Sequence, residues 1–239
     1  MQIERFNIAE RFRGPPRSGN GGYTCGRIAR HLRGTPAVRL RIPPPVNTSL
    51  RLEYTDDEAS LFHGAALVGE AKQSRLDLQA PPAPSYEQAI DASRSYLGFH
   101  THSFPGCFVC GPGRAPGDGL RIFPGPLSGG STLAAPWIPD LSLADDPRWV
   151  NPEFLWSALD CTGAFAVLPA KEDVAIVLGE LCTLIMGEAA PNERCVVTGW
   201  PLTVEGRKRL AGSAVYAEGG RLVALARAVW IEVPLSDWK

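Results

Sequence analysis

The feature that most constrains this chain is a predicted helix, from about residue 152 to 168, that has almost no polar face. The side chains that leave it apolar all round are Phe154, Leu155, Trp156, Ala158, Leu159, Ala164, Phe165, Ala166 and Val167. A helix of this kind must be buried on every side. A sheet that wraps around the helix provides such burial, so we expect a sheet to enclose it.

Segments in which apolar or small residues alternate with polar ones predict the strands of that sheet. The chain begins with an extended segment up to Arg13, and a first helix follows at about residues 23–32. The predicted strands are 37–42, 49–54, 59–71, 120–123, 131–137, 175–185, 194–204, 208–217 and 221–233.

An extended start, one helix and a run of strands with short turns occur in this order twice. One helix against a mostly antiparallel sheet predicts an α+β fold in each half. The proline-rich stretch QAPPAPS, residues 79–85, interrupts strand and helix alike. We therefore expect one unit at 1–80, a linker with a short helix (about 86–97) at 81–104, and a second unit at 105–239.

Similar local sequences support a duplication. Asn20-Gly21-Gly22 begins the first helix and Asn151-Pro152-Glu153 begins the second. Asparagine is a favoured N-cap, and proline is favoured at the first helical position. The stretch GAALVGEA at 64–71 also resembles GSAVYAEG at 212–219, which predicts an internal repeat.

Composition excludes several classes of protein. The formal net charge of −1 provides no basic field for nucleic acid. The first ten residues, MQIERFNIAE, have no signal-peptide pattern, and no apolar run is long enough to span a membrane. Six cysteines without a signal peptide are typical of reduced thiols. We therefore expect a cytoplasmic protein without nucleic-acid or membrane partners.

Several stretches resemble a known family. They are CFVCGP at 107–112, GDGLRIFPGP at 117–126, NPEFLWSALDCTGAFA at 151–166 and GRKRLAGSAVYAEGGRLVALARAVW at 206–230. They are similar to hotdog-fold thioesterases of the phenylacetate-pathway type, over most of residues 105–235. The stretch from Asn20 to Tyr23 resembles the helix start of fused double-hotdog acyl-CoA thioesterases, more weakly over 10–75. The resemblance implies a double hotdog, in which each unit has a central apolar helix wrapped by an antiparallel sheet.

The resemblance also implies which residues form the site. In that family the central helix begins with His-Gly-Gly, and an acid follows nine residues after the histidine. Here Asn151 takes the place of the histidine and Asp160 lies nine residues later, whereas Ala29 lies nine residues after Asn20. The implied working site therefore pairs Asp160 with residues 20–23 of the first half.

The chemistry of these residues agrees with that site. The N–H groups of Gly21 and Gly22, at a helix N-terminus, could stabilise the oxyanion of a thioester. Asp160 could act as a general base or as a nucleophile, and Thr162 could orient water. For substrate binding we expect contacts from Asn20, Tyr23 and Asn151.

Other interpretations of the same residues remain open. Asp160 could pair with a buried arginine or cap a turn, and the two glycines could form an ordinary turn. The family histidine is absent from both halves, and Ala228 stands near the place of a glutamine that the fused enzymes use. These departures favour a second hypothesis, a non-catalytic protein that binds acyl-CoA or lipid.

Four cysteine and histidine residues between residues 100 and 110 could form a metal site. Cys107, Cys110, His100 and His102 could provide four zinc ligands. A tight turn with buried thiols is the interpretation that we prefer, so we expect no metal and no cofactor. A redox C-x-x-C is disfavoured because Gly111-Pro112-Gly113 follows it, where a helix would be needed.

Cations near a predicted turn could bind the phosphates of coenzyme A. Arg207 and Lys208 are the candidates, and solvated charges at a sheet edge are the alternative. The expected partner is an acyl-CoA or acyl-carrier thioester, and the resemblance implies a homodimer.

The sequence thus predicts a thioester hydrolase. A nucleophile elbow G-x-S-x-G and a phosphate-binding loop are both absent, which excludes an α/β-hydrolase and a P-loop NTPase. Hotdog hydratases have a histidine five residues after the aspartate, where this chain has Phe165. A hotdog enzyme of another acyl reaction is a third hypothesis, which would need an extra acid or histidine near Asp160, such as Glu153 or Glu180.

Overall fold

The computed structural model describes residues 1–169, 171 and 173–238. Its helices are α1 (Gly21–Ala29), α2 (Tyr86–Ser93) and α3 (Pro152–Ala166). Its strands are β1 (Gln2–Asn7), β2 (Pro36–Leu40), β3 (Ser49–Tyr54), β4 (Glu58–His63), β5 (Ala66–Gln73), β6 (Gly125–Pro126), β7 (Leu133–Trp137), β8 (Val174–Ile185), β9 (Cys195–Glu205), β10 (Lys208–Ala217) and β11 (Arg221–Pro234). Short 3-10 helices include Glu10–Phe12, Leu97–Phe99, Leu141–Leu143 and Leu235–Trp238.

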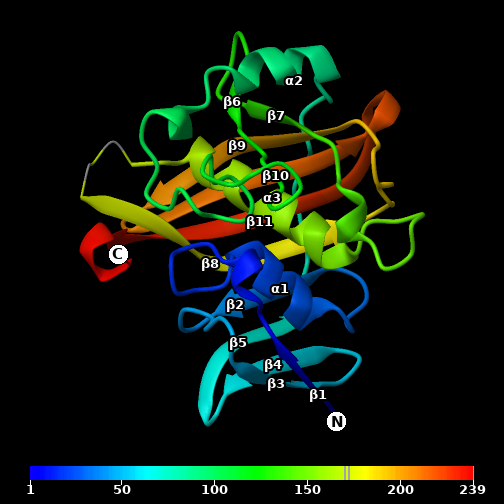
Figure 1. The fold of residues 1–239 in the computed structure, drawn as a ribbon, viewed down its shortest axis with the longest axis vertical. Coiled ribbons are helices and arrows are strands. Elements are labelled where there is room, and N and C mark those ends of the chain that lie inside the picture. Colours follow the sequence, from blue (N-terminus) through cyan, green and yellow to red (C-terminus); the bar gives the residue numbers. More distant parts are fainter. Residues whose placement is uncertain (170, 172, 239) are drawn as a thin grey trace.

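In the described part of the chain these strands form one sheet, in which each pair of neighbouring strands is antiparallel. The strand order is β1-β3-β4-β5-β2-β8-β11-β10-β9-β7-β6. Its two halves repeat one topology: β1, α1 and β2 to β5 are arranged as β7, α3 and β8 to β11 are. The predicted α+β class, with two similar units, is therefore confirmed. Figure 1 shows the first unit in blue and cyan below the second.

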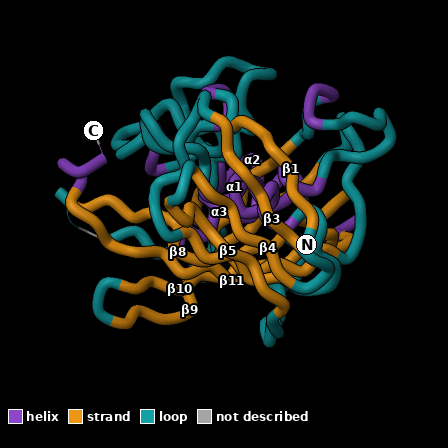
Figure 2. Tube along the Cα trace, turned by 90° about the horizontal axis from the view of Figure 1, so that it is seen from below, coloured by secondary structure: helices purple, strands orange, loops and turns teal. Residues whose placement is uncertain are grey.

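The two units meet in the sheet where β2 pairs with β8, with Val38 opposite Leu181. On one side of this joint, α1 and α3 lie next to each other, between the strands and the loops (Figure 2). The limits predicted for the units, 1–80 and 105–239, contain these two runs of strands. The exact boundaries of the units stay a prediction.

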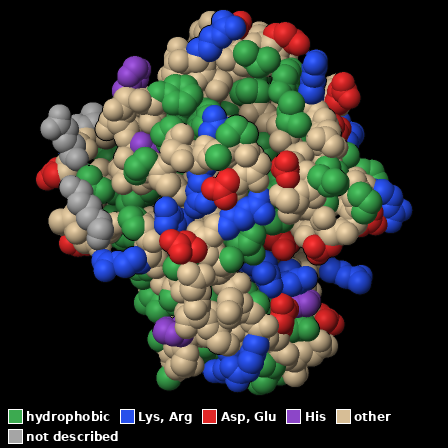
Figure 3. All heavy atoms as spheres, viewed as in Figure 1, with side chains coloured by type: hydrophobic (Ala, Val, Ile, Leu, Met, Phe, Trp, Pro, Cys, Tyr) green, Lys and Arg blue, Asp and Glu red, His purple; other side chains and the backbone are tan. Residues whose placement is uncertain are grey.

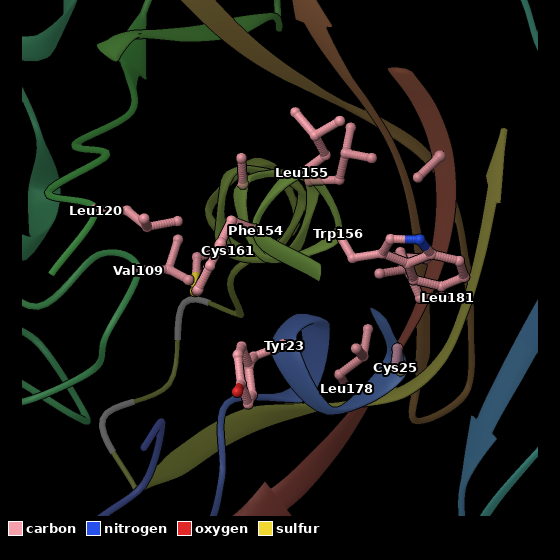
Figure 4. Close-up of a cluster of buried hydrophobic side chains, with 14 of the residues drawn as sticks. Tyr23, Cys25, Val109, Leu120, Phe154, Leu155, Trp156, Cys161, Leu178 and Leu181 are labelled. Atoms are coloured by element: carbon pink, nitrogen blue, oxygen red, sulfur yellow. The ribbon is translucent and has the colours of Figure 1, made fainter. Parts of the chain in front are cut away.

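Helix α3 is buried as its composition predicts. Every residue from Phe154 to Ala164 is buried. The hydroxyl of Ser213 on β10 donates to the carbonyl of Leu159 at 2.6 Å, which joins the helix to the sheet. Phe154, Leu155 and Trp156 belong to the apolar core around the helix, which Figure 4 shows.

Two glycines allow α1 to approach α3 closely. A Cβ atom added at Gly22 would lie 2.6 Å from Cβ of Asp160 and 2.6 Å from the carbonyl oxygen of Trp156. A Cβ atom added at Gly26 would lie 2.6 Å from Cα of Glu153. Because real Cβ contacts are longer than this, the helices can cross at this distance only where the side chain is hydrogen.

Two of the strand predictions are wrong. Residues 59–71 form two strands, β4 and β5, because the chain turns at Gly64, whose φ is 58°. Residues 120–123 are not a strand of the sheet. Their N–H groups bond a loop instead, from Leu120 to the carbonyl of Phe108 and from Ile122 to that of Val109. Arg121 between them has a φ of 54°, which interrupts an extended chain.

The predicted helices are right in place and differ at their ends. The first helix begins at Gly21 rather than at residue 23. The short helix ends at Ser93 rather than at residue 97, and a capping box of Ser85 and Gln88 begins it. The third helix ends at Ala166 rather than at residue 168.

The sequence repeat does not coincide with the structural repeat. Residues 64–71 lie in β5 and the turn before it, whereas residues 212–219 lie mainly in β10. In the repeated topology β5 corresponds to β11, and β10 corresponds to β4. The similar sequences therefore belong to strands that do not correspond in the two units. The evidence for duplication is the strand order, which is the same in both units.

The proline-rich segment after β5 packs on the outer face of the sheet. Leu76, Leu78, Ala80 and Ala83 pack against Trp200, Tyr216 and Leu225 of β9, β10 and β11. The hydroxyl of Tyr216 donates to the carbonyl of Pro81. Because the neighbouring Ser213 of β10 faces α3, Tyr216 and Trp200 lie on the opposite face of the sheet. The segment thus follows a fixed course across that face.

The surface agrees with the balanced composition. On the face shown in Figure 3, cationic and acidic side chains are interspersed. None of the helices in the described residues has the length and apolar content that a membrane crossing needs.

Candidate active site

A cavity of about 860 Å³ opens beside the crossing of α1 and α3. Asn20 and Gly21 line it from the start of α1, and Asp160 and Cys161 line it from α3. Much of the remaining wall is apolar and includes Ala164, Phe165, Leu168, Ile176, Leu178 and Trp230. A volume of this size is typical of sites for small molecules and cofactors.

Asn20 connects the start of α1 to the acid on α3. Its Oδ1 accepts a hydrogen bond from the N–H of Tyr23 at 2.9 Å, which is the expected N-cap bond. Its Nδ2 donates to Oδ2 of Asp160 at 2.7 Å. The side chain is buried, so this single amide serves two helices away from solvent.

Asp160 is a buried carboxylate with two differently bonded oxygens. Oδ2 accepts from Asn20 and, at 2.9 Å, from the backbone N–H of Gly22. Oδ1 has no hydrogen-bond partner among the described residues. Burial raises the pKa of Asp160 to about 7, although the bonds from Gly22 and Asn20 act to lower it. Oδ1, the oxygen without a partner, therefore belongs to a residue that lines the cavity.

The two glycines that were expected to form an oxyanion hole differ in position. Gly22 does not line the cavity, and its N–H is bonded to Asp160. Gly21 does line the cavity, and no acceptor in the described part of the chain bonds its N–H. The N–H of Gly21, at the positive end of α1, is therefore available to a ligand in the cavity. Gly22 instead binds Asp160 and allows α1 and α3 to cross closely.

Tyr23 is buried outside the cavity lining. Its ring stacks on Phe12 with 4.3 Å between centroids, and its hydroxyl accepts from Arg27 at 3.3 Å. Burial raises the pKa of Tyr23. Tyr23 is connected to the site through its backbone N–H, which donates to Oδ1 of Asn20.

Asn151 and Thr162 also lie outside the cavity lining. Asn151 is at the N-cap of α3, but its side chain makes no capping bond and accepts from the N–H of Asp145 at 3.1 Å. Of the two asparagines expected to cap helices, Asn20 makes the side-chain N-cap bond and Asn151 does not. Thr162 is fully buried, and its backbone packs against β9 at Gly199.

The other acids that were considered are placed elsewhere. Glu153 lies at the close contact between α3 and Gly26. Glu180 accepts from the guanidinium of Arg39 at 2.6 Å. Neither lines the cavity, so Asp160 is the acid that the described residues place in its wall.

The cations that face the cavity differ from those expected. Arg207 and Lys208 lie at the turn between β9 and β10 and are not part of the lining. Arg41 and Lys171 line the cavity and are exposed to solvent. The former pairs with Glu70, and Nζ of the latter lies 3.8 Å from Glu232.

A group of thiols lies beside Asp160. Sγ of Cys107 is 3.7 Å from Sγ of Cys161, and Sγ of Cys110 is 3.4 Å from Nε2 of His102. His100, the other candidate ligand, is not in the cavity lining. The sequence placed Cys107, Cys110 and His102 together, but it treated Cys161 only as a small core residue.

Comparison with known proteins places the fold. No protein-family model matches the chain, and no curated protein matches it. A tesB protein of Mycobacterium avium subsp. paratuberculosis superposes with a TM-score of 0.62 at 14% identity, over 97% of this chain and 93% of that one. An acyl-CoA thioesterase II of Mycobacterium marinum superposes with 0.59 at 14% identity, with the same coverage.

A conserved protein with a hot dog fold from Alicyclobacillus acidocaldarius gives a TM-score of 0.61 at 11% identity, over 97% of this chain and 93% of that one. Because these likenesses extend over nearly the whole of each chain, the protein has the double-hotdog fold that the resemblance implied. At such low identity they are evidence for the fold alone.

Proposed function

We propose that the protein hydrolyses an acyl thioester, with the carboxylate of Asp160 as general base or nucleophile. The observation that carries this proposal is the state of its carboxylate: one oxygen is fixed by Asn20 and Gly22, the other is buried without a hydrogen-bond partner among the described residues, and the residue lines a largely apolar cavity. A buried, half-bonded carboxylate costs free energy, which its use in a reaction would explain.

The geometry allows two routes for this carboxylate. In the first, Oδ1 takes a proton from water as the water oxygen attacks the thioester carbonyl. The C–S bond of the tetrahedral intermediate then breaks, and the leaving thiolate takes that proton from Asp160. In the second, Oδ1 attacks the carbonyl itself, the thiolate leaves, and water then hydrolyses the anhydride. In both routes the N–H of Gly21, at the positive end of α1, donates to the carbonyl oxygen as negative charge develops on it.

For the substrate we propose an acyl-CoA. The apolar wall formed by residues such as Leu178 and Trp230 suits an acyl chain or an aryl group. The exposed cations Arg41 and Lys171 suit phosphates outside the cavity. Two of the structures with the same fold carry names of the thioesterase II type or of tesB, which supports the same substrate class.

The test is thiol release from a panel of acyl-CoAs of increasing chain length, with Asp160→Asn beside the native protein. We expect hydrolysis by the native protein and a loss of at least about 100-fold in the variant. Glu153→Gln is the matched control, because this acid is on the same helix outside the cavity. Equal hydrolysis by Asp160→Asn and the native protein would exclude the proposed role.

Turnover in ¹⁸O-labelled water separates the two routes. Direct attack by Asp160 leaves solvent oxygen in its side chain after repeated turnover, when water opens the anhydride at the carbonyl carbon of Asp160. Attack by activated water leaves the side chain unlabelled and places the label in the released acid alone. Mass spectrometry of the peptide that contains Asp160 measures the difference.

One observation favours a second function, acyl-CoA binding without hydrolysis. The bonds from Asn20 and Gly22 to Asp160 tie α1 to α3, so the acid also has a purely structural use. A binding protein would protect the thioester from hydrolysis and would bind acyl-CoA equally well after Glu153→Gln. Binding of the ligands without thiol release identifies this second function.

A further inference from the structure

Three buried thiols converge in the wall of the cavity. The Sγ atoms of Cys107, Cys110 and Cys161 all lie within 4.8 Å of one another, and each side chain is buried. The first two belong to a loop, and the third is on α3. Figure 4 shows Cys161 directed from α3 toward the loop that carries Val109.

The spacing of the sulfur atoms fits a shared metal ion. Zinc binds thiolates at about 2.3 Å in tetrahedral geometry, which places neighbouring sulfur atoms about 3.8 Å apart. The distance between Sγ of Cys107 and Sγ of Cys161 is 3.7 Å. Because the other two sulfur–sulfur distances do not exceed 4.8 Å, the three thiols need little movement to bind one ion.

One side-chain amide lies close to two of the three sulfur atoms. Nδ2 of Asn20 lies 3.8 Å from Sγ of Cys107 and 4.0 Å from Sγ of Cys161. An amide donor beside sulfur stabilises negative charge on it, as the outer contacts of a metal ligand do.

His102 completes these outer contacts and is not itself a ligand. Its Nδ1 accepts from the N–H of Phe104 at 2.9 Å, so in the neutral ring the proton is on Nε2. Nε2 is 3.4 Å from Sγ of Cys110, toward which it donates. A nitrogen that carries a proton cannot bind a metal, which leaves the three sulfur atoms as the ligands.

We propose that Cys107, Cys110 and Cys161 bind one soft divalent cation, zinc, through three thiolates, with a fourth coordination position toward the cavity. The ion joins the 104–123 loop to α3 beside Asp160. This revises the expectation, from the sequence alone, that the chain binds no metal. It does not depend on the proposed hydrolysis, because its test measures the metal.

The test is titration of the reduced, metal-depleted protein with Co²⁺ and then with Zn²⁺. We expect one thiolate-to-cobalt charge-transfer spectrum per chain, which one equivalent of zinc removes. Cys110→Ser should weaken the binding at least 10-fold, while Cys195→Ser, which changes a buried cysteine away from the cluster, should not. His102→Ala should retain one ion per chain with an affinity about 10- to 100-fold lower.

A second measurement uses the native chain, so it does not depend on a variant that folds. Zinc should slow alkylation of Cys107, Cys110 and Cys161 and leave that of Cys25, Cys182 and Cys195 unchanged, as mapped by mass spectrometry. Absence of the charge-transfer band, binding unaffected by Cys110→Ser, or no zinc-dependent protection of the three thiols would each overturn the proposal.

Discussion

The side-chain amide of Asn20 donates to Oδ2 of Asp160 at 2.7 Å, although 140 residues separate the two in sequence. The same amide caps α1 through its oxygen, so the acid and the helix start are held by one group. Asn20→Ala removes both bonds at once. We expect it to lower the free energy of unfolding by roughly 2 kcal/mol, measured by denaturant unfolding.

Asn151→Ala is the matched control for that change. Asn151 is also an N-cap asparagine, but its side chain makes no capping bond to α3. Its loss should cost less than about 1 kcal/mol, because only a bond at the surface, from the N–H of Asp145, disappears. Equal losses for the two variants would contradict the role given to Asn20.

Gly22→Ala should separate the two central helices. The added Cβ would meet Cβ of Asp160 and the carbonyl oxygen of Trp156 at 2.6 Å, and neither can move without α3. We expect a loss of roughly 3 kcal/mol in the free energy of unfolding. Gly130→Ala, where a Cβ meets no atom closer than 4.0 Å, should change it by less than about 0.5 kcal/mol.

The free energy of unfolding should decrease as the pH falls into the range where Glu4 becomes protonated. Burial acts to raise the pKa of Glu4, but the bond with His31 and the charges of Arg30 and Arg27 outweigh it, so the pKa is lowered. A lowered pKa in the folded state stabilises the protein above the unfolded value of about 4.3, and this stabilisation is lost as the pH falls through the folded pKa.

Glu4→Gln tests this relation. The variant should be less stable than the native chain near neutral pH, and the difference should shrink as the pH falls below about 4. Thermal unfolding across this range measures it. A difference that stays constant with pH would show that the contribution of Glu4 is not electrostatic.

Filling the cavity should shorten the acyl chain that the protein accepts. Ala164 is on α3 and lines the cavity, so Ala164→Leu reduces the space for the substrate. We expect kcat/KM for long acyl-CoAs to fall about 10-fold, with a smaller change for short ones. Ala166→Leu, on the same helix but outside the cavity lining, should leave kcat/KM for long relative to short acyl-CoAs unchanged.

The sequence was sufficient for elements whose residues share one environment along their length. The apolar helix and the alternating strands at Ser49–Tyr54 and Lys208–Ala217 lie where they were predicted. The turn at Gly64 was missed because small and apolar residues continue on both sides of it. Residues 120–123 have the apolar pattern of a strand because Leu120 and Ile122 are buried. The segment that they pair with is a loop and not the sheet.

The candidate site was predictable only where spacing along the chain carried the information. Asn20 and Asp160 were found from the helix starts and the distance to the acid. The partner of Cys107 was missed because Cys161 is 54 residues away and comes close only after folding. Arg41 and Lys171 were missed in the same way, because the cavity brings together strand ends and loops that are distant in sequence.

The proline-rich segment that crosses β9, β10 and β11 also limits how copies of this chain can assemble. Its leucines and alanines cover Trp200 and Tyr216, so the chain itself occupies that part of the outer face of the sheet. A second copy cannot stack its sheet there while the segment stays in place. A homodimer, which the resemblance implies, would therefore not bury Trp200 and Tyr216 directly between two sheets.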